Sequence, residues 1–315
     1  MNIIMTGATG FVGRALALRL LRDRHRVVAL VRSVARARGQ LGAEVECVAL
    51  DDEDATAAAV ASADAVVNLA GEPIMDRRWT AARKQALRDS RLALTQRLVA
   101  MILRRDRALE VLVSASAVGY YGDRGEQPLD ETARAGDDFA AALCRDWEAA
   151  ASLARPRASR VVLARLGIVL GGEGGALAAM SPLFKLGLGG RVGSGQQWVP
   201  WVHLEDAVEA LAMAVTQPAL DGPVNVVAPA PVRNHELAAE LGRALRRPAF
   251  VPAPALALRA VLGERAQMVL GGQRALPARL TELGFVFRHA TLKDALAEAT
   301  SARGPVELRS GAEPS

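Results

Sequence analysis

Apolar residues recur along the first half of the chain in two alternating patterns. Short apolar runs, mostly β-branched, occupy residues 2–7, 26–32, 45–50, 63–71 and 109–116. The stretches between them carry apolar residues at helical spacing. Strands that are apolar on both faces are typical of a parallel sheet covered by helices, so the pattern predicts a doubly wound α/β domain.

The pattern changes after about residue 170. The stretches GGEGGALAAM and KLGLGGRVGSGQQ are rich in glycine and predict loops. Beyond them, a helix is expected to begin near Glu205, residues 222–229 predict a strand, and Asn234 is expected to cap a helix over 235–246. The second half therefore departs from the strict alternation of strands and helices.

Composition and charge narrow the classes of function. The chain has 315 residues and a formal net charge of +5, but its basic residues are dispersed among acidic ones. This favours a site for an anionic small molecule over a nucleic-acid surface. Two cysteines are too few for a disulfide framework, and four scattered histidines indicate no metal site. No apolar run is long enough for a membrane span, and the N-terminus reads as a strand, so a cytoplasmic protein is expected.

Three glycines between the first strand and the first helix form a candidate phosphate cradle. Gly7 permits a tight turn, Gly10 lets the backbone approach a pyrophosphate, and Gly13 lets helix and strand pack closely. The helix N-terminus then offers free N–H groups and a partial positive charge to the phosphates. The spacing predicts a dinucleotide site, with these further contacts in the same turn: Thr9, Phe11 and Val12.

The strand ends that follow indicate which dinucleotide binds. Arg32 and Ser33 end the second strand where NAD-binding proteins carry a carboxylate, so NADPH is expected rather than NADH. Asp51 or Asp52 either reaches the adenine or belongs to an acidic helix start. The fourth strand ends in NLAG, where Leu69, Ala70 and Gly71 are expected to line the nicotinamide ribose.

Several longer motifs carry a family resemblance. TGATGFVG, NLAG, SASAVGYYG and WVHLEDAVEAL resemble the extended short-chain dehydrogenase/reductase superfamily. CRDWE, LGIVLGGEGGAL, GSGQQWVPWVHLED and ELGFVF narrow the resemblance to its nucleotide-sugar-epimerase-like "epimerase family protein" subgroup. The resemblance implies a Rossmann domain over 1–165 with segments of about 203–230 returning to it. It also implies a smaller α/β domain over 166–303 that mainly binds the substrate. The last residues, 304–315, are expected to form a disordered tail.

The same resemblance implies a catalytic serine and a Tyr-x-x-x-Lys pair, in which the tyrosine moves a proton and the lysine lowers its pKa. Ser116 ends its strand at the expected place. If Glu148 marks the register of the next helix, the tyrosine and lysine positions are Ala140 and Cys144. A shift by one residue does not restore the pair.

Three explanations for the missing pair stay open. Another residue moves the proton, with Tyr121 or its neighbour Tyr120 the first candidates, assisted by Lys84, Arg78 or His203. Alternatively, the hydride transfer needs little acid–base help. The third explanation is a sensor or scaffold that binds NADP(H) without turnover.

Aromatic and charged residues outside the cofactor motifs predict a substrate site for a small molecule. The candidates are Glu72, Arg78, Trp79, Trp198, Trp201 and His203. The alternative for Trp79 is a place in the core, and for His203 a purely structural role. Arg165 either contacts a ligand or pairs with an acid. The protein is expected to be a monomer or a homodimer.

Overall fold

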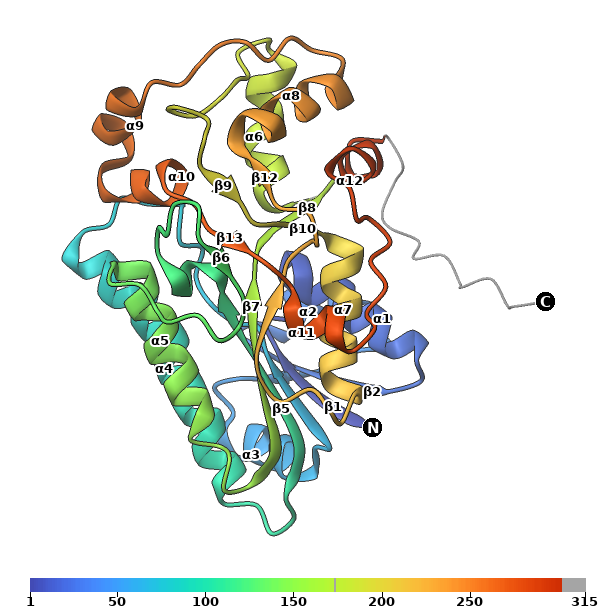
Figure 1. Cartoon of the computed structure of the whole chain (residues 1–315). Coiled ribbons are helices and arrows are strands. Elements are labelled where there is room, and N and C mark those ends of the chain that lie inside the picture. The colour runs from blue at the N-terminus through green and yellow to red at the C-terminus, as the bar shows by residue number, and fades with distance from the viewer. Residues whose placement is uncertain (173, 302–315) are drawn as a thin grey trace.

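A parallel sheet of seven strands forms the centre of the protein (Figure 1). The computed structural model describes residues 1–172 and 174–301. The strands are β1 (Asn2–Thr6), β2 (Arg26–Val31), β3 (Glu46–Ala49), β4 (Ala65–Asn68), β5 (Leu109–Ala117), β7 (Ala158–Leu166) and β11 (Gly222–Val226). Their order is β11-β7-β5-β4-β1-β2-β3, with every pairing parallel. The order reverses between β1 and β4, and the predicted doubly wound fold is confirmed.

Helices cover both faces of this sheet (Figure 1). One face carries α1 (Phe11–Arg22), α2 (Val34–Leu41) and α7 (Leu204–Thr216), and the other carries α3 (Glu53–Ser62), α4 (Ala81–Leu103) and α5 (Phe139–Ser152). Successive residues of β1 alternate between these layers: Ile3 and Met5 face the first, and Ile4 faces the second. Because both faces are covered, the strands are apolar almost throughout.

A second layer of structure lies beyond the carboxyl ends of the strands (Figure 1). Its strands are β8 (Ile168–Gly171), β9 (Trp198–Val199), β10 (Trp201–His203) and β12 (Val232–Arg233), and its main helices are α6 (Gly175–Lys185), α8 (Asn234–Leu245) and α12 (Leu292–Ala299). They share a hydrophobic cluster that includes Phe184 and Trp201.

Short elements complete the fold and connect its layers. They are the 3-10 helices η1 (Val118–Tyr121) and η2 (Gly263–Ala266), the strands β6 (Pro128–Leu129) and β13 (Arg274–Ala275), and the helices α9 (Ala255–Leu262), α10 (Gln267–Leu270) and α11 (Ala278–Glu282). β13 pairs with β6, which connects the C-terminal half to the loops that follow β5.

Two local predictions are wrong. The stretch GGEGGALAAM, expected to be a loop, contains the start of α6. The alanines and the leucine after Gly175 form the helix, and the glycines affect only its first turn, where Gly175 has a φ of +63°. Asn234 does not cap α8. It is the first residue of the helix, its side chain accepts the Val192 N–H at 2.7 Å, and Glu236 instead accepts the N–H of Arg233 at 2.6 Å.

The segment of about 203–230 was expected to return to the first domain. The returning segment contains α7 and β11, which lie in the sheet layer, while the two-domain boundary itself stays a prediction. The predicted tail over 304–315 lies outside the described residues. Among the helices that the structure describes, none combines the length and the apolar character that crossing a bilayer requires.

Candidate functional site

The glycine turn after β1 is built by close backbone contacts. Gly7 has a φ of +71°, and a Cβ on it would lie 2.7 Å from the carbonyl carbon of Leu69. A Cβ on Gly13 would lie 2.1 Å from the carbonyl oxygen of Gly7. Gly10 is the N-terminal capping residue of α1, whose first turn carries no acidic side chain. The first N–H groups of α1 can therefore donate hydrogen bonds to a phosphate without competition from a carboxylate.

Phe11 anchors this turn to the C-terminal half of the chain. A Cβ on Gly171, Gly174 or Gly175 would lie 2.7, 2.6 or 3.0 Å from a ring atom of Phe11. The ring therefore packs closely against the backbone of these glycines. Two other predicted contacts of the turn differ in exposure: Thr9 is exposed and Val12 is half-buried.

The ends of β2 and β3 form the adenosine side of the predicted site. Arg32 is exposed where β2 ends, and Ser33 caps α2 by accepting the N–H of Arg36 at 3.5 Å. Asp52 caps α3, so one of the two acids at the end of β3 has a structural role. Asp51 is exposed beside it.

The ends of β4 and β5 lie side by side. Asn68 pairs in register with Ser114. Its amide accepts from Thr6 at 2.6 Å and donates to Thr95 at 2.8 Å, which fixes β4 to β1 and to α4. The next residues of the β4 loop follow this anchor: Leu69 and Ala70 are half-buried and Gly71 is exposed. Ser116 extends beyond the same edge on the neighbouring strand.

Ser116 belongs to a buried polar network. Its hydroxyl donates to Glu148 at 2.6 Å, and Glu148 accepts two hydrogen bonds from Arg165 at 2.8 and 2.9 Å. Arg165 also donates to the Tyr121 hydroxyl at 2.9 Å, which in turn donates to Asn225 at 2.7 Å. All five residues are buried. Sequence reasoning named Ser116, Tyr121 and Arg165 but missed the carboxylate that joins them.

Burial decides the protonation states in this network. It raises the pKa of Tyr121 to about 12, against the opposing effect of the Arg165 charge. Burial alone would lower the pKa of Arg165, but the hydrogen bonds and charge of Glu148 raise it overall. The guanidinium also lies 3.6 Å from the ring centre of Tyr120. Tyr121 is therefore a neutral, hydrogen-bonded phenol at physiological pH.

The two small residues of α5 are packed rather than open. Ala140 and Cys144 are 3 % and 6 % exposed, so neighbouring residues cover both small side chains. Burial raises the pKa of the Cys144 thiol to about 11, and the Glu148 carboxylate adds to this effect. Neither residue offers a proton or a charge at neutral pH.

The predicted substrate residues after β4 face three different surroundings. Glu72 forms an ion pair with Arg83. Arg78 is exposed and donates to the carbonyl of Ala260 at 3.2 Å, at the end of α9. Trp79 is buried and donates to the carbonyl of Ile74 at 2.9 Å, with its ring 5.0 Å from that of Phe139. Packing accounts for the position of Trp79.

The three aromatic residues of GSGQQWVPWVH also lie in three different surroundings. Trp198 is half-buried, with the guanidinium groups of Arg233 and Arg274 lying 3.8 and 5.0 Å from its ring centre. Trp201 has no exposed surface and lies in the hydrophobic cluster of the second layer. His203 is buried at the start of α7 and bonds to Glu298 at 2.9 Å.

The structure brings together histidines that are far apart in the sequence. The rings of His203 and His289 are 3.8 Å apart, and ligand atoms of these two and Glu205 lie within 4.8 Å of one another. Each already has a protein partner, since His203 bonds to Glu298 and His289 bonds to Glu205. These hydrogen bonds account for the cluster.

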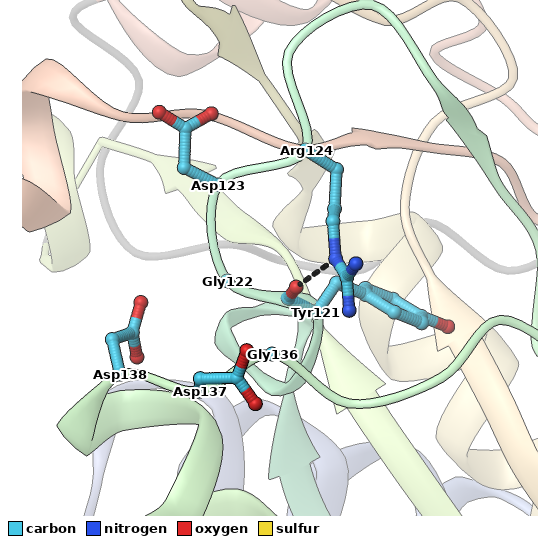
Figure 2. A pocket seen from close by; sticks show the side chains of 7 residues that line it. All are labelled: Tyr121, Gly122, Asp123, Arg124, Gly136, Asp137 and Asp138. Carbon is cyan, nitrogen blue, oxygen red and sulfur yellow. Dashed lines mark hydrogen bonds between the residues drawn. The ribbon is translucent and has the colours of Figure 1, made fainter.

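A surface hollow of about 240 Å³ lies at the start of α5 (Figure 2). It is lined by Tyr121, Gly122, Asp123, Arg124, Gly136, Asp137 and Asp138. Figure 2 shows the Tyr121 carbonyl accepting from Arg124, while the phenol hydroxyl points away from the acids. Three carboxylates against one guanidinium repel an anionic ligand, so this hollow does not suit a nucleotide.

Comparison with known proteins gives a consistent family. Residues 3–227 match the NAD dependent epimerase/dehydratase family, and residues 253–299 match a domain of unknown function, DUF1731. Epimerase family protein Mb2239 of Mycobacterium bovis is 44 % identical over 303 residues, covering 96 % of this chain and 98 % of its own.

Two solved structures are similar over nearly the whole chain. Human epimerase family protein SDR39U1, crystallised with NADPH, is 36 % identical with a TM-score of 0.86, covering 96 % of this chain and 100 % of its own. A nucleoside-diphosphate sugar epimerase of Corynebacterium glutamicum is 32 % identical with a TM-score of 0.74, covering 95 % of this chain and 57 % of its own.

Proposed function

Because the chain belongs to the NAD dependent epimerase/dehydratase family, we propose that it binds NADP(H) and acts as an oxidoreductase or epimerase-like enzyme on a small molecule. The observation that carries this proposal is the shared edge of β1, β4 and β5. There the glycine turn contacts Leu69, and Ser116 lies one strand further on. A dinucleotide laid across this edge has its pyrophosphate at α1 and its nicotinamide half beside β4 and β5.

The choice of NADPH over NADH rests on Arg32. This side chain is exposed at the end of β2, next to Ser33, and an arginine there suits a 2′-phosphate. The human relative that was crystallised with NADPH supports the same choice.

Replacing Arg32 tests the cofactor directly. We expect Arg32→Asp to raise the Kd for NADPH by about 10- to 100-fold, because a charged hydrogen bond is lost and a repulsive carboxylate is gained. The Kd for NADH should change by about threefold or less. Isothermal titration with both nucleotides measures the two values. Arg157→Asp is the matched control, since Arg157 is exposed at the amino ends of the strands, just before β7, whereas Arg32 lies at their carboxyl ends. Equal losses for both nucleotides refute the role of Arg32.

Trp198 is the residue we propose for the substrate side. An indole ring with two guanidinium groups beside it provides both a stacking surface and positive charge. Arg233 is paired with Glu126, whereas Arg274 makes no ion pair within the described part of the chain, and its Nε is buried without a partner. We propose an anionic substrate that contains a ring, such as a nucleotide-linked sugar or a carbonyl compound.

A second candidate function is a sensor or scaffold that binds NADP(H) without turnover. The observation in its favour is the burial of the residue proposed to transfer the proton. Tyr121 is a fully buried, neutral phenol, and Ala140 and Cys144 cannot replace it as an acid or base. A turnover screen with NADPH across carbonyl compounds and nucleotide sugars separates the two functions. Absence of turnover, with tight NADPH binding established, supports the sensor.

A further inference from the structure

Arg91 differs from the other basic residues in the first half of α4. Arg83 pairs with Glu72 and Asp76, Lys84 pairs with Glu264, and Arg88 pairs with Asp146. Arg91, one turn further along the helix, has no carboxylate within 4.0 Å among residues 1–172 and 174–301.

The guanidinium of Arg91 is held firmly although it lacks an ion pair. It donates to the carbonyl of Glu72 at 2.9 Å and to that of Leu87 at 3.2 Å. Its Cζ lies 5.2 Å from the ring centre of Trp147, and a Cβ on Gly71 would approach the same carbon to 3.1 Å. The planar group is thus fixed against the backbone of the β4 loop.

The charge of Arg91 is hydrogen-bonded but is not balanced by a negative group. The side chain is half-buried and donates to backbone carbonyls, and no carboxylate pairs with it. Burial lowers the pKa of Arg91, which means that the surroundings disfavour its charge. The nearby Cys144 thiol is neutral, because burial raises its pKa to about 11. An anionic ligand at the adjoining β4 loop can therefore supply the balancing negative charge.

The topology indicates which part of a dinucleotide reaches Arg91. The sheet order reverses between β1 and β4, so a bound dinucleotide crosses from α1 toward β4 and β5. Its adenosine half then lies toward Arg32 at the end of β2. Its nicotinamide half lies between Gly71 and Ser116, and Gly71 is the residue against which Arg91 is packed.

We propose that Arg91 binds the nicotinamide half of the dinucleotide, through oxygen atoms of the nicotinamide ribose and the adjoining phosphate. It acts from α4 at the point where α5 provides only Ala140 and Cys144. This inference rests on the proposed binding of NADP(H). Arg91 would then supply, from α4, the positive charge beside the nicotinamide that the lysine of Tyr-x-x-x-Lys supplies in the family from the helix equivalent to α5.

The test compares two ligands on Arg91→Met. We expect the Kd for NADPH to rise by about tenfold or more, as for the loss of a charged hydrogen bond. The Kd for 2′,5′-ADP, which carries the adenosine half and its 2′-phosphate but no nicotinamide half, should stay within about twofold. Arg32→Asp should weaken both ligands. Isothermal titration of purified full-length protein measures all of these constants.

Two further variants make the result interpretable. Arg97→Met removes a different arginine of α4, and it should leave NADPH binding unchanged. Unlike Arg91, Arg97 has an Nη2 that is buried without a hydrogen-bond partner. Arg91→Lys keeps the charge but loses the planar fork, and it should bind NADPH with intermediate affinity.

The outcomes separate this inference from the proposed function. Wild-type protein that binds no NADPH overturns both. Wild-type protein that binds NADPH, with Arg91→Met binding it within twofold, overturns the role of Arg91 alone. Equal losses of NADPH and 2′,5′-ADP in Arg91→Met also overturn that role, because they indicate a general disturbance of the site.

Discussion

Tyr121 shows how burial can turn a reactive residue type into a structural one. Its hydroxyl joins Arg165 and Asn225, and Asn225 lies 104 residues further along the chain. The phenol therefore ties the loop after β5 to the last strand of the sheet. A proton acceptor at neutral pH would need a lower pKa, whereas burial raises the pKa of this residue to about 12.

Replacing Tyr121 by phenylalanine should reduce stability. We expect Tyr121→Phe to lower the free energy of unfolding at pH 7 by about 1–3 kcal/mol, because the side-chain oxygen of Asn225 loses its buried donor and Arg165 loses one of its acceptors. Urea denaturation measures the change. Tyr120→Phe is the control, since the Tyr120 hydroxyl makes no hydrogen bond to any described residue and the ring beside Arg165 is kept. Similar losses in both variants would contradict the role of the Tyr121 hydroxyl.

The same residue predicts a dependence of stability on pH. The pKa of Tyr121 is raised from 10.0 to about 12 in the folded protein, so between these values the unfolded chain binds fewer protons. The contribution of Tyr121 is complete below pH 10 and is lost as the pH rises toward 12. The difference in unfolding free energy between wild type and Tyr121→Phe should therefore shrink between about pH 10 and about 12. A constant difference would contradict the raised pKa.

At the residue scale, local motifs were predictable and the network was not. Gly7, Gly10, Gly13 and Ser116 follow from the turn and strand that contain them. Glu148 marked a helix register in the sequence, but its bond to Ser116 spans 32 residues. Only the paired ends of β5 and β7 and the packing of α5 bring the members together.

At the scale of elements, the start of α7 fixes the last part of the chain. Asp206, 1 % exposed, accepts the N–H groups of Arg288 and His289 at 2.8 and 3.0 Å. Residues of α12 then return to the second layer, where Glu298 meets His203. α7 therefore covers the sheet and also holds the C-terminal segment.

Asp206→Ala should uncouple that segment. We expect a loss of about 2–4 kcal/mol in the free energy of unfolding, because the backbone N–H groups of Arg288 and His289 both lose their buried carboxylate acceptor. Hydrogen exchange of residues 285–291 should increase in the same variant. Glu209→Gln on the same helix is the control, since it weakens a partly exposed ion pair with Arg19 and should cost less than about 1 kcal/mol. Unchanged exchange in Asp206→Ala would contradict this role.

Element predictions succeeded where a hydrophobic pattern spanned the whole element. The strands of the sheet follow from short apolar runs, and α1 follows from apolar residues at helical spacing. α6 was missed because glycines at its start outweighed the helix-forming residues after them. The start of α8 was misplaced because Asn234, a typical cap, bonds instead to Val192, which is distant in sequence.

At the scale of the whole molecule, the sheet is finished by a late part of the chain. β11 pairs with β7 although more than fifty residues separate them. α7 packs on the same face of the sheet as α1. A doubly wound sheet was predictable because each strand is apolar on both faces. The way in which the second half completes the sheet follows from packing that no local stretch encodes.

Truncation tests this dependence. A fragment of residues 1–165 lacks β11 and α7, so one edge of β7 and part of an apolar face are exposed. We expect it to aggregate, whereas a fragment of residues 1–230 should be more soluble and show more native-like circular dichroism. Size-exclusion chromatography of the two fragments measures the difference. A monomeric 1–165 fragment that unfolds cooperatively would show that the sheet is complete without these elements.

Phe11 limits how sequences with this fold can diverge. Its ring lies where Cβ atoms on Gly171, Gly174 and Gly175 would have to be. While the phenylalanine is present, a side chain at any of these three positions collides with its ring. A small residue in place of Phe11 would relieve that collision at Gly174, whereas Gly175 would still need its φ of +63°. Sequence variation in the phosphate turn is therefore constrained by a segment more than 150 residues away.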